Sequence, residues 1–321
     1  MFKKLVVSLA VMLFSTAHAF QPNGPITATI GFGVGSGNEI SFRAVSSMIE
    51  KQNPKLNFVI ETRPGADEII ALTHFGDLPP NGQNLYIISQ NNFALINAWY
   101  PNRLKFQLSE LELVTNIAKS PLCIVANANS TVNTPKDLID RIKNTKTPIT
   151  FGLGSAGQKL IFEYIMEKTG GNSSLVQTTQ YKGPAQALQD LAGGHIEFAI
   201  LPTAVANTIA SSGKIKFIGL TSERKLPGLP TVPLMKDYVP GMNFYAAWGI
   251  ALPKGSPQAH VDYYRNLFVP VINSAEAKEF FDKNMMMVFP EEHTPAGLRY
   301  TIHKVDEQWG PYARKFNPNN K

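Results

Sequence analysis

Short apolar runs alternate with amphipathic segments of helical period along most of this chain. Residues 26–32 are predicted to form a strand; a Gly-rich turn follows, and Ile40, Val45 and Ile49 then fall on one face of a helix. The same order repeats, with further strands predicted at residues 58–60, 85–89, 122–126, 149–151, 176–181, 196–201, 215–221 and 245–252. Serial strand–helix units predict an α/β fold of parallel sheets with helices on both faces.

Local signals place several of the helices. Thr134 is predicted to cap a helix that begins at Pro135, with Asp137 as the acid of its first turn. Further helices are predicted at residues 68–75, 160–168, 184–191 and 203–211, and in the tail at 258–284, broken near Pro270, and at 295–316.

The length of the chain indicates two lobes rather than one. The chain has 321 residues, which is more than a single hydrophobic core usually supports. Only 17% of its residues are charged, and glycine (24) and proline (23) are plentiful. This composition is typical of compact, turn-rich proteins and argues against disorder.

The first residues have the three parts of a secretory signal peptide. Lys3 and Lys4 are basic, residues 5–14 form an apolar run, and a small-x-small pattern ends at Ala19. The apolar run covers only about half of the roughly 20 residues that a membrane-spanning helix needs. No cysteine stands beside the cleavage site for attachment of a lipid. We therefore expect export to the periplasm with cleavage after Ala19, which leaves a soluble mature chain.

Charge and cysteine content narrow the possible partners. Removal of Lys3 and Lys4 with the signal peptide lowers the net charge from +6 to +4, and no cluster of lysine and arginine interleaved with aromatics is present. We therefore expect no nucleic-acid partner, and we expect a monomer. Cys123 is the only cysteine and lies in an apolar stretch, which predicts a buried, unreactive thiol and no internal disulfide.

Two Gly- and Ser-rich loops, at residues 33–39 and 152–159, each follow a predicted strand and lead into a helix. Ligands of open parallel sheets bind beyond the carboxyl ends of the strands. Glycines let backbone N–H groups turn toward a bound group, and a helix N-terminus adds roughly half a positive charge. The loops therefore predict a site for a carboxylate or a phosphate. The second loop matches G-x-G-x-x-G, but no acidic residue follows about 20 positions later, so a dinucleotide is not predicted.

The sequence offers no catalytic or metal-binding constellation. It contains no phosphate-loop lysine motif, no G-x-S-x-G nucleophile elbow and no H-E-x-x-H motif. Residues 291–293 bring two glutamates and a histidine together, but adjacent residues rarely converge on one ion, so a solvated loop is the favoured interpretation. We expect no cofactor, no metal and no enzymatic activity.

Several segments of the chain resemble the solute receptors of tripartite tricarboxylate transporters, known as Bug receptors. The matching segments run in order along nearly the whole mature chain, at residues 24–26, 35–43, 63–66, 81–82, 154–157, 181–185, 190–194, 221–227, 230–233 and 248–257. The resemblance implies a type II periplasmic binding protein, with two α/β lobes that close over a ligand. Lobe one would comprise residues 20–122 and 244–321, and lobe two residues 123–243.

The resemblance also implies the ligand class and the residues that hold it. The ligand of such a receptor would be a small organic acid, bound by backbone amides and hydroxyl groups. The corresponding positions, which agree with the loops chosen above, are Phe32, Gly33, Gly35, Ser36, Gly37, Asn38, Ser89, Gln90, Asn91, Gly154, Ser155, Ala156, Gly157, Gln158, Lys159, Tyr181 and Thr203.

Four charged residues depart from the family pattern or bear on the charge of the ligand. Glu39 replaces an aspartate of the first loop, and Asp67 and Glu68 stand where glycines are usual. Acids that face the pocket would disfavour a dianion, and Lys159 could restore the attraction. The alternative is that these charges are solvated groups at helix starts.

The leading hypothesis is a periplasmic receptor that binds a carboxylate or an amphoteric metabolite by lobe closure and delivers it to a membrane permease. Two alternatives stay open. One is a periplasmic enzyme on the same fold, with Ser155 as its nucleophile; the other is a ligand-dependent sensory subunit of a receptor kinase.

Overall fold

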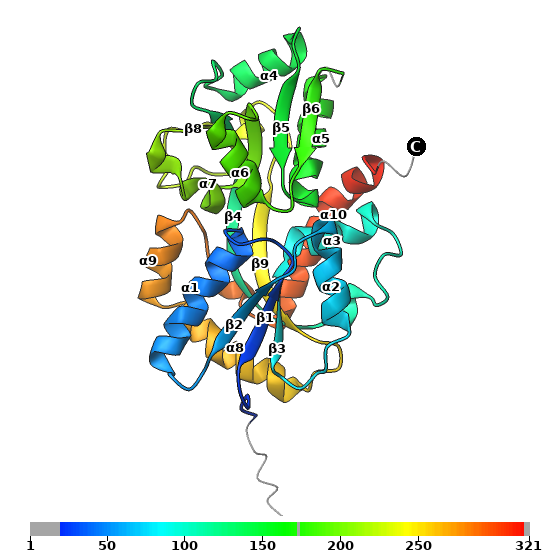
Figure 1. The fold of residues 1–321 in the computed structure, drawn as a ribbon, viewed down its shortest axis with the longest axis vertical. Coiled ribbons are helices and arrows are strands. Elements are labelled where there is room, and N and C mark those ends of the chain that lie inside the picture. Colours follow the sequence, from blue (N-terminus) through cyan, green and yellow to red (C-terminus); the bar gives the residue numbers. More distant parts are fainter. Residues whose placement is uncertain (1–19, 172–173, 318–321) are drawn as a thin grey trace, which may run out of the picture.

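Two mixed β-sheets, joined by one shared strand, organise the molecule into two lobes (Figure 1). The computed structural model describes residues 20–171 and 174–317, so the predicted signal peptide lies outside the described residues. In the first sheet, β1 (Ile26–Ile30) pairs in parallel with β2 (Phe58–Thr62) and β3 (Asn84–Ser89), and β3 pairs antiparallel with β9 (Tyr245–Leu252).

The second sheet repeats the parallel motif around a different strand. Its β5 (Ile149–Leu153) pairs in parallel with β6 (Val176–Gln180) and β7 (Phe198–Pro202). The long strand β4 (Glu112–Asn127) pairs antiparallel with β7 on one side and with β8 (Ile215–Leu220) on the other.

Strand β4 belongs to both sheets. Its first part, from Glu112 to Pro121, pairs antiparallel with β9, whereas the part from Leu122 onward pairs with β7 and β8. Figure 1 shows β4 and β9 running side by side between the lobes. The backbone between the two sheets is thus a pair of continuous strands, a connection on which one lobe can rotate against the other.

Helices cover both faces of each sheet, and four hydrophobic clusters fill the layers between them. The helices are α1 (Gly37–Gln52), α2 (Ile69–Gly76), α3 (Gln90–Trp99), α4 (Pro135–Asn144), α5 (Ala156–Thr169), α6 (Pro184–Gly193), α7 (Thr203–Asn207), α8 (Gln258–Ile272), α9 (Ala275–Lys283) and α10 (Pro295–Lys315). Trp99 of α3 and Trp309 of α10 share a cluster with residues of α5. Two helices of the first lobe therefore pack directly on the second.

The α/β fold class predicted from the alternation of strands and helices is confirmed, with three differences in detail. The sheets are mixed rather than parallel, because β4, β8 and β9 run against their neighbours. Helix α3 was not predicted; it starts immediately after β3, with no turn residues between them. Helix α7 ends at Asn207, four residues before the predicted end.

The predicted break near Pro270 is confirmed, and it lies at Asn273 and Ser274, just after the proline. Pro270 lies inside α8, which ends at Ile272, and the next helix starts where the Ser274 hydroxyl accepts the Ala277 N–H. Pro270 stands close to the helix end and removes a single backbone donor, so the N-cap decides the boundary.

The capping box predicted at the start of α4 is present. The Thr134 hydroxyl accepts the Asp137 N–H at 3.1 Å, and the Asp137 carboxylate accepts the Thr134 N–H at 3.0 Å. Loss of an N-cap hydroxyl typically costs about 1 kcal/mol. We expect Thr134→Ala to lower the free energy of unfolding by about 1 kcal/mol in urea titrations, and Thr131→Ala, at an exposed position without a cap, to change it by less than about 0.5 kcal/mol.

Candidate functional site

A narrow cavity lies between the two lobes, where the carboxyl ends of β1, β3, β5 and β7 face one another. The N-termini of α1, α3 and α5 converge on it, so three helix dipoles present their positive ends. Its volume of about 30 Å³ is room for one or two water molecules. The lining residues are Phe32, Gly37, Asn38, Ser89, Asn91, Asn92, Leu122, Ser155, Gly157, Gln158, Pro184, Pro202, Phe244, Ala246 and Trp248.

The turn before α1 fits against an aromatic wall of the cavity. Gly37 is the first residue of α1, and a Cβ at this position would overlap the ring of Trp248. Next to it, Asn38 donates to the Ile87 carbonyl at 3.4 Å and is thereby held against β3. The predicted residues Gly37 and Asn38 therefore line the cavity because glycine admits the close approach of α1 to β9.

The turn before α5 is rigid and internally bonded. The Ser155 hydroxyl caps α5 by accepting the Gln158 N–H at 3.3 Å, and the Gln158 side chain accepts the Gly154 N–H at 2.5 Å. A Cβ on Gly154 would overlap the backbone of Gly183 and Pro184 at the start of α6. The two neighbouring loops of the second lobe are therefore packed backbone to backbone at the mouth of the cavity.

Helix α3 contributes two amides with different surroundings. The Asn91 Oδ1 accepts the Ala247 N–H at 3.2 Å and ties the helix to β9. The Asn92 amide is buried and lines the cavity, yet neither its oxygen nor its nitrogen makes a hydrogen bond of normal geometry. Buried amides are nearly always paired in proteins. The Asn92 amide lies beside the buried Glu68 carboxyl and lowers the pKa of that group, so it links the cavity wall to the acid behind it. The site residues predicted from the sequence ended one residue earlier, at Asn91.

Eight of the predicted site residues line the cavity: Phe32, Gly37, Asn38, Ser89, Asn91, Ser155, Gly157 and Gln158. Gly33, Gly35, Ser36, Gly154 and Ala156 belong to the same turns without lining it. Four more have partners elsewhere: Gln90 bonds to Asn116, Lys159 lies 4.7 Å over the Trp99 ring, Tyr181 donates to Asp190 at 2.7 Å, and Thr203 bonds to Ser120 at 2.7 Å.

The acids singled out in the sequence lie directly behind the cavity wall. Ala66, Asp67 and Glu68 are three successive non-glycine residues with positive φ, at 47°, 49° and 75°. Such a backbone is strained, typically by 1 kcal/mol or more at each residue. It displaces the start of α2 from the predicted residue 68 to Ile69 and directs the two carboxyl groups to opposite sides.

Glu68 points into the core of the first lobe. It is fully buried, Tyr86 donates a hydrogen bond to it at 3.3 Å, and a Cβ on Gly31 would overlap it. Burial raises the pKa of the Glu68 carboxyl well above its usual range, against the hydrogen bond from Tyr86 and together with the neighbouring charge of Asp67.

Asp67 points toward the second lobe. It accepts a hydrogen bond from Tyr100 at the end of α3. Burial raises the pKa of the Asp67 carboxyl, while Tyr100, the backbone N–H of Ala156 and the Lys159 ammonium lower it part of the way. Since Ala156 is the first residue of α5, an acid of one lobe sits at a helix N-terminus of the other.

Residues 42–305 match the family described as the tripartite tricarboxylate transporter family receptor. That range covers most of the chain and all elements of the cavity except β1 and the first turn of α1. The chain belongs to this family. A UPF0065 protein of Cupriavidus necator is 22% identical to this receptor over 264 residues, which cover 82% of this chain and 79% of that protein.

Solved structures agree with the receptor in fold. The periplasmic binding protein BugD superposes with a TM-score of 0.83 at 23% identity, covering 92% of this chain and 97% of its own. A Rhodopseudomonas palustris protein with adipate has a TM-score of 0.84 at 20% identity, covering 90% and 96%. The receptor therefore has the two-lobed fold of periplasmic binding proteins, as predicted, and its family consists of periplasmic solute receptors.

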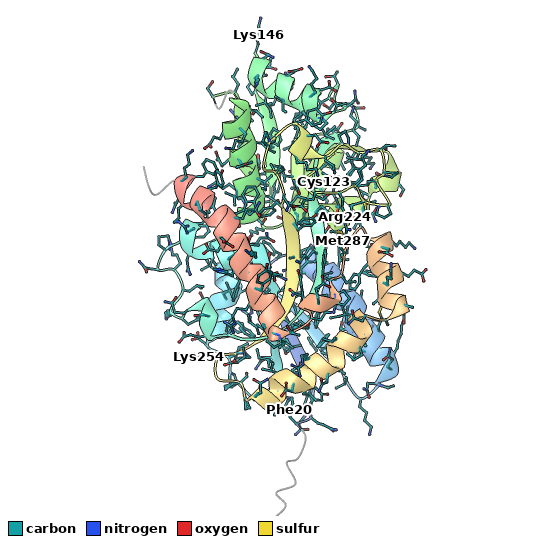
Figure 2. The ribbon with its side chains drawn as sticks, turned by 180° about the vertical axis from the view of Figure 1, so that it is seen from behind. Phe20, Cys123, Lys146, Arg224, Lys254 and Met287 are labelled. Atoms are coloured by element: carbon teal, nitrogen blue, oxygen red, sulfur yellow. The ribbon has the colours of Figure 1, made fainter. Side chains whose placement is uncertain are left out.

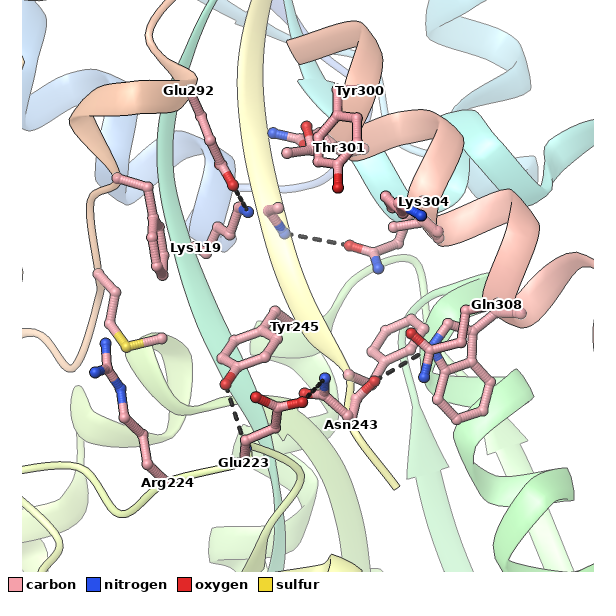
Figure 3. Close-up of a pocket in the computed structure, with 18 residues that line it drawn as sticks. Lys119, Glu223, Arg224, Asn243, Tyr245, Glu292, Tyr300, Thr301, Lys304 and Gln308 are labelled. Atoms are coloured by element: carbon pink, nitrogen blue, oxygen red, sulfur yellow. Dashed lines mark hydrogen bonds and ion pairs between the residues drawn. The ribbon is translucent and has the colours of Figure 1, made fainter. Parts of the chain in front are cut away.

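The receptor has a second and larger cavity, of about 510 Å³, on the opposite side of β4 and β9. Figure 2 shows this side, with Arg224 and Met287 beside the crossing strands, and Figure 3 shows its walls. Its charged groups largely have partners within the protein: Lys119 pairs with Glu292 at 2.7 Å, and the Asn243 amide donates to Glu223 at 2.8 Å.

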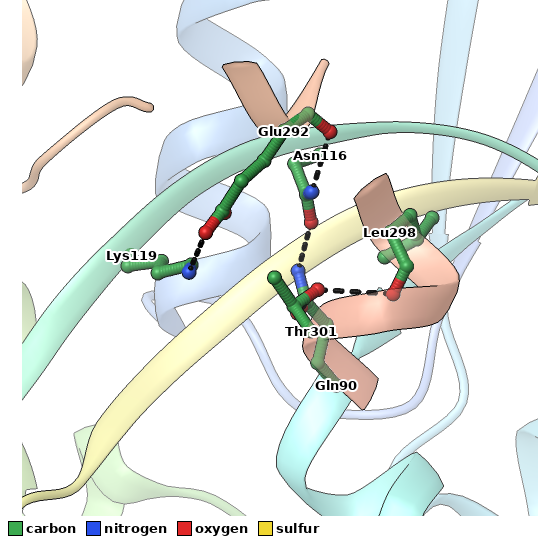
Figure 4. A network of polar contacts seen from close by, with 6 residues as sticks. All are labelled: Gln90, Asn116, Lys119, Glu292, Leu298 and Thr301. Carbon is green, nitrogen blue, oxygen red and sulfur yellow. Dashed lines mark hydrogen bonds and ion pairs between the residues drawn. The ribbon is translucent and has the colours of Figure 1, made fainter. Parts of the chain in front are cut away.

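A polar network closes the floor of the second cavity (Figure 4). Gln90 donates to Asn116 and accepts the Thr301 hydroxyl at 2.7 Å, and Asn116 donates to the Glu292 carbonyl at 2.8 Å. This network accounts for Gln90, which links α3 to α10 instead of facing the interlobe cavity. In the wall of this second cavity, Asn243 Oδ1 and Glu292 Oε2 are buried without a hydrogen bond. The smaller cavity is the better candidate for a ligand site because the N-termini of α1, α3 and α5 converge on it.

The described part of the receptor contains no group of three or more histidine, cysteine, aspartate or glutamate side chains placed to hold a metal ion. In the same residues, no helix is both long and apolar enough to cross a membrane. Cys123 is buried in β4, as predicted, and burial raises the pKa of its thiol.

Proposed function

We propose that this receptor captures a small organic acid, either a carboxylate or an amphoteric metabolite, in the cavity between its lobes and delivers it to the permease of a tripartite tricarboxylate transporter. One observation carries the proposal: the N-termini of α1, α3 and α5, drawn from both lobes, converge on one cavity. Helix N-termini stabilise anions, and the adipate bound to a structural neighbour is such an anion.

The lobes in this proposal comprise residues 20–122 with 244–321, and residues 123–243. The change of pairing partners in β4 after Pro121 supports the first boundary, and the start of β9 at Tyr245 supports the second. The cavity volume of about 30 Å³ is too small for a solute of six or more heavy atoms. Ligand entry therefore requires the lobes to separate about β4 and β9 and to close again.

The proposal includes export with cleavage after Ala19, a monomeric mature receptor, no nucleic-acid partner and no catalytic step. Two observations support binding without chemistry. The Ser155 hydroxyl is engaged in capping α5, and none of the described residues that line the cavity is a histidine, so a serine nucleophile would lack a base.

Asn92 provides the test of the cavity. We expect Asn92→Leu, which keeps the size of the side chain but removes both polar atoms, to weaken binding of the tightest ligand of an organic-acid panel at least tenfold in isothermal titration calorimetry.

Lys304→Ala, on the wall of the second cavity, is the matched control and should leave the affinity unchanged. A loss of affinity in Lys304→Ala with none in Asn92→Leu would move the ligand to the second cavity. Absence of binding across the whole panel by the folded receptor would reject the proposed function.

A further inference from the structure

The two cavities of the receptor lie on opposite faces of the strands between the lobes. Along β9, Tyr245 and Ala247 line the second cavity, whereas Ala246 and Trp248 line the interlobe cavity. Successive side chains of a strand point to opposite faces of its sheet. The second cavity therefore lies directly behind the strands on which the lobes rotate, and the ligand cleft lies in front of them.

The second cavity has one wall from each lobe. Glu223 and Arg224 follow β8 in the second lobe, and Tyr300, Lys304 and Gln308 belong to α10 of the first lobe. Figure 3 shows Glu223 and Arg224 on one side of the cavity and Tyr300 and Lys304 on the other. A rotation of one lobe against the other thus changes the distance between the two walls.

The two walls touch at the edge of the second cavity, next to β9. Trp309 of α10 donates a hydrogen bond to the Asn243 carbonyl at 3.2 Å, and its ring packs edge to face on Phe244, with centroids 5.4 Å apart. Lys304, by contrast, pairs with Glu307 of its own helix at 2.7 Å. The lobes are therefore in contact beside the strands, and a space of about 510 Å³ separates the walls beyond that contact.

Opening of the interlobe cavity must narrow the second cavity. The interlobe cavity has a volume of about 30 Å³, so a ligand enters only when the lobes separate about β4 and β9. A rigid rotation moves the parts in front of its axis and the parts behind it in opposite directions. Glu223 and Arg224 then approach α10. Because packed protein interiors are poorly compressible, this rotation needs the empty space between the two walls.

We infer that the second cavity is the space into which the lobes rotate when the ligand cleft opens, so that its lining residues control ligand entry and release without touching the ligand. Side chains that fill the cavity oppose opening. Side chains that are shortened, as in Lys304→Ala, leave the space free. This inference rests on the proposed function and adds a control of its opening step.

Bulky substitutions on the two walls test the inference. Gln308→Trp in the first lobe and Arg224→Trp in the second each place an indole in the cavity from an exposed position. With the tightest ligand among succinate, malate, glutarate and adipate, we expect the association and dissociation rate constants in stopped-flow experiments to fall at least about threefold, and the affinity to stay equal or rise. His303→Trp and Lys225→Trp, at exposed positions outside the cavity, are the matched controls and should keep the wild-type rates.

A measurement without ligand separates this inference from the proposed function. Val34→Cys and Lys182→Cys place spin labels at exposed positions of the two lobes. These positions flank the mouth of the cleft, since a Cβ on Gly183 would lie 3.6 Å from the Gly33 nitrogen. Pulsed electron paramagnetic resonance should show a population with a longer distance, which is the open state. Both tryptophan variants of the cavity walls should reduce that population at least about threefold.

The outcomes distinguish the inference from the proposed function. Unchanged rates and an unchanged distance distribution in both folded variants would overturn the inference and leave the proposed function intact. Faster dissociation in the folded variants would also overturn it, because a filled cavity must slow opening. Loss of the open population without binding of any organic acid would reject the proposed function and uphold the coupling between the two cavities.

Discussion

Replacement of Glu68 by glutamine is expected to make the receptor more stable at neutral pH. Glu68 is fully buried beside Tyr86 and Asp67, and burial raises the pKa of its carboxyl well above the ordinary value of 4.5. Glutamine has nearly the same shape, cannot ionise, and can still accept the hydrogen bond from Tyr86. The variant therefore removes the cost of placing an ionisable group in the core.

The sign of the pH dependence follows from proton uptake. Above pH 4.5 the unfolded chain releases the Glu68 proton while the folded protein retains it, so the folded state binds more protons and its stability falls as the pH rises. The Glu68 contribution is fully present below pH 4.5 and is lost at about 1.4 kcal/mol per pH unit until the folded-state pKa is passed. The stability of Glu68→Gln should depend less on pH than that of the wild type, and the stability gained by the substitution should vanish near pH 4.5.

Thermal unfolding at pH 4.5, 6.0 and 7.5, followed by circular dichroism, measures this difference. Glu276→Gln, at an exposed position with a weak pair to Lys51 at 3.5 Å, is the control and should change stability by less than about 0.5 kcal/mol at each pH. If Glu68→Gln were less stable than the wild type at pH 7.5, the buried carboxyl would have to be ionised and paired, contrary to the structure.

Gly154→Ala is expected to be among the most damaging single substitutions in the cavity wall. A Cβ at this position would overlap the carbonyl carbon of Gly183 and the nitrogen of Pro184. Backbone atoms cannot swing aside as a side chain does, so the loops before α5 and α6 must separate. We expect the free energy of unfolding, measured in urea, to fall by about 3 kcal/mol or more. This is at or above the upper end of the stability cost of overpacking a core. Ligand affinity should fall at least tenfold, because α5 would move from the cavity.

Gly33→Ala is the matched control for this substitution. It lies in the other predicted anion loop, but a Cβ there would have no heavy atom within 4 Å. Gly33→Ala should leave the free energy of unfolding unchanged or raise it by up to about 1 kcal/mol, because alanine reduces the conformational freedom of the unfolded chain. Equal effects of the two substitutions would contradict the backbone-to-backbone packing at Gly154.

Much of the fold could be predicted from local signals. The alternation of apolar runs and helical periods places β5 and α5, and the Thr134 capping box places the start of α4, because these signals act within a few residues of the chain. Helix α3 escaped prediction because it starts at Gln90, directly after the last residue of β3, with no turn between them. The antiparallel directions of β4 and β9 depend on which strands meet, and no local pattern records that.

The sequence predicted those residues of the candidate site that directly follow the ends of strands. Phe32, Asn38 and Ser155 line the cavity as expected, because residues that follow neighbouring parallel strands meet at one edge of a sheet. Gln90 and Thr203 also follow strands, yet they bond to Asn116 and Ser120 in the interior. Their direction depends on the packing of α10 and on the path of β4, which join residues far apart in the sequence.

The alternation of strands and helices determined by itself that this chain folds as an α/β protein, since each unit has only one way to bury its apolar face. The tertiary structure alone decided what the acids do. The sequence places Asp67 and Glu68 side by side, but left-handed backbone conformations turn one carboxyl into the core and the other toward α5 of the opposite lobe. Burial and the meeting of two lobes are long-range properties, and no local sequence pattern records them.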